Sequence, residues 1–134
     1  MKNLSSRTPA SNEILYTSAD GNVVTPNEIY AFGANIISNT YENGKGVIVF
    51  DAPVTEIGDY ALFCKHLTSI TIPDSVTKIG KSAFYNCISL ASINIPHSVI
   101  KIDDFTFYGC TSLTSITIPN SVTEIGEYAF NNCI

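Results

Sequence analysis

Four cysteines are the residues of this sequence whose chemistry would be most conspicuous. They are Cys64, Cys87, Cys110 and Cys133, spaced 23 residues apart. Thiols can form disulfides or bind zinc, but one cysteine per repeating unit gives a straight row that cannot surround a metal tetrahedrally. Parallel Cα–Cβ bonds in stacked units also give poor disulfide dihedral angles. We therefore predict four free, buried thiols, with disulfide or metal roles as the minor alternative.

Other candidates for catalysis or ligand binding are few. His66 follows Lys65 in a loop, and His97 occupies a turn position after a proline, so both are expected to face solvent. Asp103 and Asp104 form an isolated acidic pair. The motifs of serine hydrolases, zinc peptidases, phosphate-binding loops and EF-hands are all missing from the sequence. The sequence therefore predicts a protein that is not an enzyme and has no catalytic, cofactor-binding or metal-binding residues.

Composition argues against two classes of partner. The 134 residues include seven basic and twelve acidic side chains, for a net charge of −5, and the basic residues are scattered. Nucleic-acid binding needs a basic stripe, so the sequence predicts no nucleic-acid partner. The apolar runs are too short to cross a membrane, and residues 1–13 lack the apolar stretch of a signal peptide. The sequence alone leaves the location of the protein undecided.

The cysteines are positioned by a repeat of 23 residues. Three units begin at Leu67, Leu90 and Leu113, and a degenerate unit that has lost one residue begins at Gly46. The first and third complete units differ at only five of the 22 positions that they share. Such a period indicates a solenoid, in which each unit is one coil and stability comes from stacking on neighbouring coils.

Within each coil the apolar pattern predicts a strand, a stop and a turn. In the unit that begins at residue 67, Ile70 and Ile72 alternate with Ser69 and Thr71, which is the pattern of a strand with one buried face. Pro73 ends this strand because it lacks a backbone N–H. A second apolar pair follows, and then an Ala-Phe-x-x-Cys segment that predicts a helical or 3₁₀ turn. The residues predicted to be buried are Leu67, Ile70, Ile72, Val76, Ile79 and Phe84, with their equivalents 23 and 46 positions later.

The pattern L-x-x-I-x-I-P-x-x-V-x-x-I-G-x-x-A-F-x-x-C-x-x over residues 46–134 resembles the BspA-like leucine-rich repeats, a bacterial family. The resemblance implies a right-handed leucine-rich-repeat solenoid with short parallel strands on one face and turns or short 3₁₀ or helical segments on the other. It also implies a cell-surface or secreted protein that binds host, matrix or other cell-surface proteins. The middle unit departs from the pattern at Asp103 and Thr106, where the other units have Gly and Ala, so its local turn geometry stays open.

The residues before the repeats are expected to shield the first coil, with a separate binding module as the alternative. Residues 1–13 are rich in Ser, Asn, Thr and Pro, which predicts a flexible segment. Asp20-Gly21, between apolar segments 14–18 and 23–25, predicts a β-hairpin, and Asn43-Gly44 predicts a second turn into the first repeat. The predicted divisions are a small N-terminal β cap over 14–45 and repeats over 46–66, 67–89, 90–112 and 113–134.

Two rows of side chains are candidates for binding. Outward strand positions give a hydroxyl and amide surface, and aromatic residues near the turn give a second surface of a kind that is enriched in recognition sites. Ordinary solvated strand residues and rings that merely cover the turn are the alternatives. The candidate binding face is Ser69, Thr71, Ser92, Asn94, Ser115 and Thr117, and the candidate aromatic face is Tyr60, Tyr85, Phe105, Tyr108 and Tyr128.

These features together predict a non-catalytic protein-binding or adhesion module. The alternatives are a purely structural or assembly segment of a longer repeat array and, less favoured, a Ser/Thr face that binds a polysaccharide or crystal surface. No polar capping unit follows the fourth unit, so we also expect weak self-association through an uncapped C-terminal coil.

Overall fold

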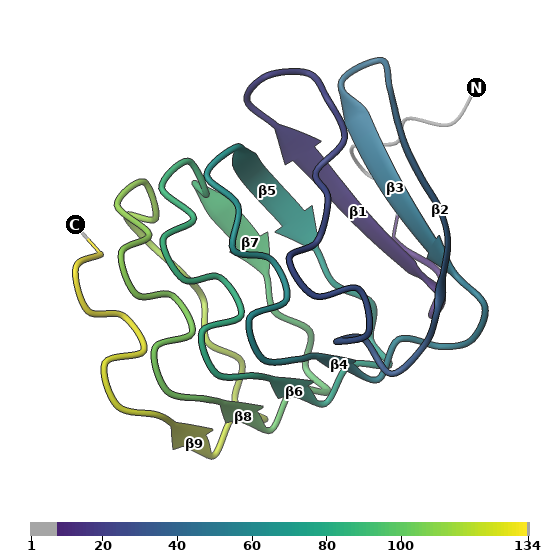
Figure 1. Cartoon of the computed structure of the whole chain (residues 1–134). Helices are drawn as coiled ribbons and strands as arrows, with labels where there is room; N and C mark the ends of the chain where they lie inside the picture. Colours follow the sequence, from purple (N-terminus) through teal and green to yellow (C-terminus); the bar gives the residue numbers. More distant parts are fainter. Residues whose placement is uncertain (1–7, 134) are drawn as a thin grey trace.

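Two segments of a coil can form strands, and the protein therefore has two sheets along one solenoid. In the fourth coil only the second of these segments forms one. The structure is a computed structural model that describes residues 8–133. Figure 1 shows the coils stacked side by side, from the N-terminal strands to the coil that carries β9. The strands are β1 (Glu13–Ser18), β2 (Ile36–Glu42), β3 (Lys45–Phe50), β4 (Glu56–Ile57), β5 (Leu67–Thr71), β6 (Lys78–Ile79), β7 (Ser92–Asn94), β8 (Lys101–Ile102) and β9 (Glu124–Ile125).

The larger sheet has the strand order β2-β3-β1-β5-β7. β5 and β7 are parallel and one coil apart, with Ile70 opposite Ile93. β1 lies between β3 and β5 and is antiparallel to both, so the strand of the degenerate first unit does not stack directly on that of the second. Ile14 and Tyr16 of β1 are buried in the same core as the repeats, and this burial favours the insertion.

The predicted N-terminal hairpin is misplaced. Asp20-Gly21 lies in a turn, but residues 23–25 form no strand, so the hairpin predicted there is wrong. Val24 is instead held by its backbone N–H, which donates to the Tyr16 hydroxyl at 3.1 Å. The hairpin joins β2 to β3 at Asn43-Gly44, whose φ angles of 52° and 77° suit a tight two-residue turn.

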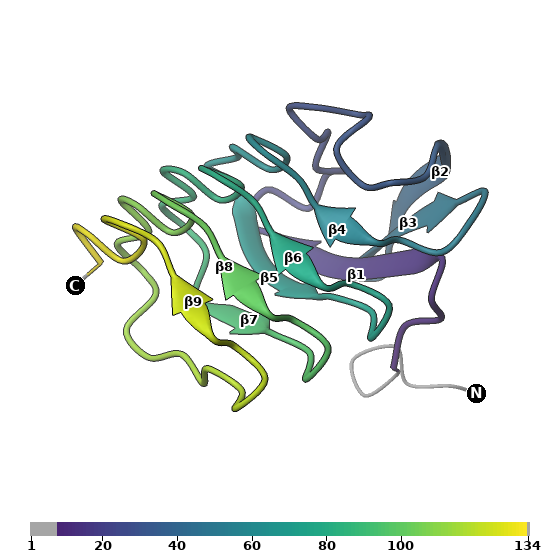
Figure 2. The same cartoon turned by 90° about the horizontal axis from the view of Figure 1, so that it is seen from below.

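The smaller sheet is parallel, with the order β4-β6-β8-β9, and Figure 2 shows its four strands side by side. It forms at the second apolar pair of each coil, which the sequence did not identify as a strand. Its register places the equivalent isoleucines of successive coils in one row: Ile57, Ile79, Ile102 and Ile125. Each two-residue strand is too short to persist alone, so the row depends on stacking.

The Ala-Phe-x-x-Cys segment is a series of turns, and the helical alternative is wrong for the described residues. Ser82 adopts φ 55°, which an α-helix does not allow. Alternate backbone N–H groups donate to the next coil, Phe84 to Thr106 at 2.9 Å and Asn86 to Tyr108 at 2.7 Å. The N–H groups between them donate three residues back, as Tyr85 does to Ser82 at 3.2 Å. The turns therefore form a third ladder between coils.

The predicted core is confirmed in the second unit, where all six apolar positions are buried. In the third unit five are buried, and Ile93 is half-buried. In the fourth unit only Leu113 is buried, and Ile125 is 51% exposed, because no described residue packs on the outer side of this coil. The expected self-association through this coil stays a prediction, as does the right-handed sense of the solenoid.

Candidate functional site

The polar face predicted from the sequence runs across β5 and β7. The parallel register places Ser69 beside Ser92 and Thr71 beside Asn94. Ser69 and Thr71 are half-buried, so their predicted full exposure is wrong. The cause is β1, because Thr17 on this strand hydrogen-bonds to the Ser69 hydroxyl.

The other four residues of the candidate binding face, together with His97, line one groove of about 340 Å³ between β7 and residues 115–117. All four are exposed: Ser92, Asn94, Ser115 and Thr117. No backbone hydrogen bond joins β7 to 114–118, two segments that the structure describes in full. We name this site the polar groove. Its lining of hydroxyl, amide and imidazole groups can donate and accept hydrogen bonds.

His97 belongs to this site, although the sequence indicated only a solvated turn residue. It follows Pro96 directly after the strand segment of its coil, which places it at one end of the polar groove. The equivalent positions are Asp74 and Asn120, so the third coil alone among the complete units supplies an imidazole here. The position of His97 directly after the predicted strand was the sequence feature that could have placed it in the polar groove.

Most of the candidate aromatic face forms a continuous row of rings, which we call the aromatic ridge. The ring centroids are 5.5 Å apart for Phe63 and Tyr85, 5.0 Å for Tyr85 and Tyr108, 5.7 Å for Tyr108 and Phe105, and 5.2 Å for Phe105 and Tyr128. Phe63 was missed by the sequence analysis, although it lies 22 residues before Tyr85, the spacing of the shortened first unit.

Tyr60 occupies the same slot as Phe105 and Tyr128 but makes no ring contact within the described residues. The second coil has Ser82 in this slot, which separates the Tyr60 ring from that of Phe105. All four residues adopt a left-handed backbone, with φ between 55° and 59°. For a bulky residue this conformation is strained by about 1–2 kcal/mol. Hydrogen bonds between coils hold it, including Tyr60 N–H to the Lys81 carbonyl at 3.0 Å.

The four cysteines are free, as predicted. Cys87 and Cys110 are buried, but Cys64 and Cys133 are half-buried, so the predicted burial is confirmed only for the inner pair. Three thiols donate to carbonyls of the preceding coil: Cys87 to Leu62 at 2.8 Å, Cys110 to Phe84 at 3.1 Å and Cys133 to Phe107 at 3.1 Å. Burial raises the pKa of the Cys87 and Cys110 thiols, that of Cys110 to about 12. These thiols are poor nucleophiles at neutral pH because the thiolate is the reactive form.

We expect iodoacetamide to modify Cys64 and Cys133 in the native protein well before Cys87 and Cys110, which should react only after unfolding. Peptide mass spectrometry over a time course measures the four rates. The raised pKa values also make stability depend on pH: stability is fully present below the unfolded thiol pKa of about 8.5 and falls as the pH rises toward the folded value. Equal labelling rates at all four sites would contradict the structure.

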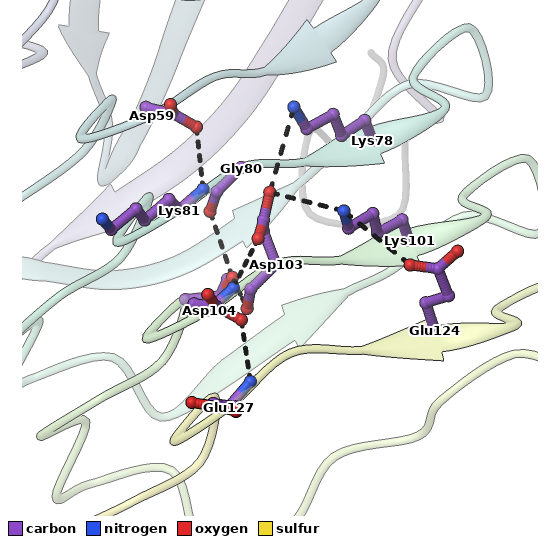
Figure 3. A network of polar contacts seen from close by, with 10 residues as sticks. Asp59, Lys78, Gly80, Lys81, Lys101, Asp103, Asp104, Glu124 and Glu127 are labelled. Carbon is purple, nitrogen blue, oxygen red and sulfur yellow. Dashed lines mark hydrogen bonds and ion pairs between the residues drawn. The ribbon is translucent and has the colours of Figure 1, made fainter.

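Carboxylates cap the backbone where the second, third and fourth coils leave the smaller sheet (Figure 3). Oδ1 of Asp59 accepts from the Lys81 backbone N–H, and Oδ1 of Asp104 accepts from that of Glu127, both at 2.8 Å. These four residues occupy equivalent positions of successive coils, and Lys81 cannot accept a hydrogen bond from Asp104. Asp103 supplies the missing acceptor, because its Oδ1 receives the Asp104 N–H at 2.7 Å.

Thr106 is the other residue of the third coil that departs from the repeat, and its side chain contacts the backbone of Asp103. The Thr106 hydroxyl is buried and lies 3.0 Å from the Gly80 carbonyl and 2.7 Å from the Asp103 carbonyl, one of which receives its proton at a time. The other Asp103 oxygen lies 3.9 Å from the ammonium groups of both Lys78 and Lys101. The turn geometry is retained, since the Asp103 N–H still donates to the preceding coil at 3.0 Å.

Residues 8–133 contain no group of three or more His, Cys, Asp or Glu side chains placed to hold a metal ion. Within the same range, no helix has the length and apolar character needed to cross a membrane. The site that the geometry does provide is a neutral polar groove on a repeating strand face.

Stacked 23-residue coils with parallel strands define the chain as a leucine-rich-repeat solenoid. A family model described as "BspA type Leucine rich repeat region" matches residues 34–134 in six copies. The chain therefore belongs to the BspA-type leucine-rich repeat family. The matched region begins at residue 34, whereas the first repeat predicted from the sequence begins at Gly46.

Solved structures of similar proteins agree with this assignment. The chain is 40% identical to a leucine-rich repeat protein from Bacteroides ovatus, with a TM-score of 0.60 over 73% of this chain and 24% of that one. It is 32% identical to one from Bacteroides capillosus, with a TM-score of 0.53 over 88% of this chain and 86% of that one. It is 36% identical to a leucine rich cell surface protein from Faecalibacterium prausnitzii, with a TM-score of 0.55 over 92% of this chain and 33% of that one. The chain thus spans about a quarter of the Bacteroides ovatus protein. No curated protein matches it.

Proposed function

We propose that this chain is a non-catalytic protein-binding module that works at a bacterial cell surface. One observation carries the proposal: four of the six polar strand residues converge with His97 on a single groove. Family membership supports a repeat-protein module, and one similar structure is described as a cell surface protein. The groove is lined by neutral hydrogen-bonding side chains and by apolar residues in equal number, a mixture that protein interfaces also present.

The experiment that tests the proposal places lysines along the polar face. Replacing Ser92, Asn94 and Thr117 together by lysine should abolish capture of the partner, because all three residues line the groove and three charged side chains would crowd it. The substitutions are at surface positions, so the free energy of unfolding should change by less than about 1 kcal/mol. Binding is measured on an array of purified matrix and cell-surface proteins, and the affinity of each captured protein is then measured in solution.

A matched control carries the same added charge elsewhere. Thr77, Thr123 and Asn131 are exposed and lie outside the polar groove. Their triple replacement by lysine should leave capture unchanged. Equal capture by both triple variants would remove the polar groove as the site, and capture of no protein by the unaltered chain would favour a purely structural role.

A further inference from the structure

A second hollow, of about 650 Å³, lies beside the aromatic ridge and is separate from the polar groove. It crosses all four coils, because its lining residues recur at equivalent positions. One row is Asn86, Gly109 and Asn132, and the neighbouring row is Lys65, Ile88 and Thr111. Phe63, which is 48% exposed, lines the hollow in the first coil, and Ile88 is 46% exposed in the second.

Several polar groups around this hollow are not used by the fold. Within residues 8–133, the Asn86 amide, the Thr111 hydroxyl and the Lys65 ammonium make no side-chain hydrogen bond or ion pair. Asn132 uses one amide N–H, which donates to the Tyr108 hydroxyl at 3.2 Å. The hollow thus combines apolar surface with free donors and acceptors.

Glycine at position 109 makes this arrangement possible. Its φ is 74°, and a Cβ atom there would lie 2.0 Å from Oδ1 of Asn86. The Asn86 side chain therefore lies over Gly109, and both residues line the hollow. Any larger residue at this position would displace the amide and fill the space.

The lining argues against two kinds of ligand. A peptide added as a strand needs free backbone groups, but here the Asn86 N–H already donates to Tyr108 at 2.7 Å and the Gly109 N–H to Asn131 at 2.9 Å. A nucleic acid needs several basic residues, and Lys65 is the single one in the lining of a chain of net charge −5. The lining suits a ligand with apolar faces and uncharged hydroxyls.

The lining positions recur once per coil and carry an amide at both ends of one row, Asn86 and Asn132, so the hollow suits a ligand with a repeating unit. Successive coils are separated by about 4.8 Å, so three coil spacings extend over roughly 14 Å along the solenoid axis. We propose that this hollow binds an oligosaccharide of neutral pyranose units that lies along the axis. The C–H faces of the sugar rings contact Phe63 and Ile88, and their hydroxyls bond to the amides of Asn86 and Asn132. This activity goes beyond the proposed protein binding.

The test uses neutral oligosaccharides of two to six units, from cellulose, xylan and mannan, titrated into the whole chain by calorimetry. Affinity should rise with chain length until the hollow is filled and then level off. Asn86→Gly with Asn132→Gly removes both amides, and glycine readily adopts the φ angles of 55° and 60° found there. This double variant should bind the best oligosaccharide at least tenfold more weakly while retaining the melting temperature of the control.

The matched control is Asn43→Gly, which makes the same change at φ 52° in the β2–β3 turn and should bind normally. The lysine triple variant of the polar groove should also bind the oligosaccharide normally, so this proposal and the proposed protein binding fail independently. Absence of binding at millimolar oligosaccharide would overturn the inference. So would full affinity in the double glycine variant, or loss of affinity in the lysine variant.

Discussion

Replacing Phe84 by alanine is expected to lower the free energy of unfolding by about 3–5 kcal/mol, the usual cost of removing a buried ring. Phe84 is fully buried, and its ring stacks on that of Phe107 with centroids 5.3 Å apart and planes 4° apart. Phe107 in turn stacks on Phe130 at 5.3 Å. The substitution therefore opens a cavity within a column of rings that joins three coils, and a rigid stack closes such a cavity poorly.

Urea denaturation measures this loss, and Phe130→Ala provides the comparison. Phe130 is equivalent in sequence but only half-buried, so its replacement should cost clearly less. For a domain with about 5–15 kcal/mol of total stability, the Phe84 variant should unfold at much lower urea concentration. Equal losses for the two variants would show that the fourth coil is packed as well as the second.

The repeating core could be predicted because one unit must bury the same positions as the next. The period, the inward residues and the proline stops all follow from apolar spacing and from the lack of a proline N–H. The small parallel strands β4, β6, β8 and β9 were not recognised, because a strand of two residues leaves no period-two pattern. The polar groove could be predicted only in part. Its strand residues were found, but the absence of backbone hydrogen bonds between β7 and residues 114–118 was not.

Strand formation in this chain is decided by neighbours as well as by sequence. Residues 67–73 and 113–119 share the identical sequence LTSITIP, yet only the first copy contains a strand, β5. β5 pairs with β1 on one side and β7 on the other, whereas no described strand covers the outer side of the second copy. The insertion of β1 depends on the same long-range pairing, so no local pattern could predict it.

The third coil offers a test of how such a repeat tolerates an irregular residue. Asp103→Gly restores the residue found in the other coils, yet it should destabilise the protein by about 1.5–3 kcal/mol, the usual net contribution of a hydrogen bond to a charged group. The reason is Lys81, which leaves the Asp104 N–H dependent on the Asp103 carboxylate. A consensus substitution would therefore be harmful here.

Adding Lys81→Asp to the Asp103→Gly variant should recover most of this loss. The new carboxylate would accept the Asp104 N–H, just as Asp59 accepts the Lys81 N–H at 2.8 Å. In the unaltered chain Lys81→Asp should bring no gain, because the acceptor is then redundant and the added negative charge lies near Asp103. A double-mutant cycle by thermal or urea unfolding should give a coupling of at least about 1 kcal/mol.

The dependence of stability on salt concentration distinguishes the contribution of the Asp104 N–H hydrogen bond from that of the ion pairs of Asp103. Lys78 and Lys101 are each more than 40% exposed and lie 3.9 Å from the carboxylate, so their contribution is small and is screened by salt. If the hydrogen bond to Asp104 dominates, the loss in the Asp103→Gly variant should persist in 1 M NaCl, where the Debye length falls to about 3 Å. A loss that disappears in salt, with no rescue by Lys81→Asp, would assign the role of Asp103 to the lysines instead.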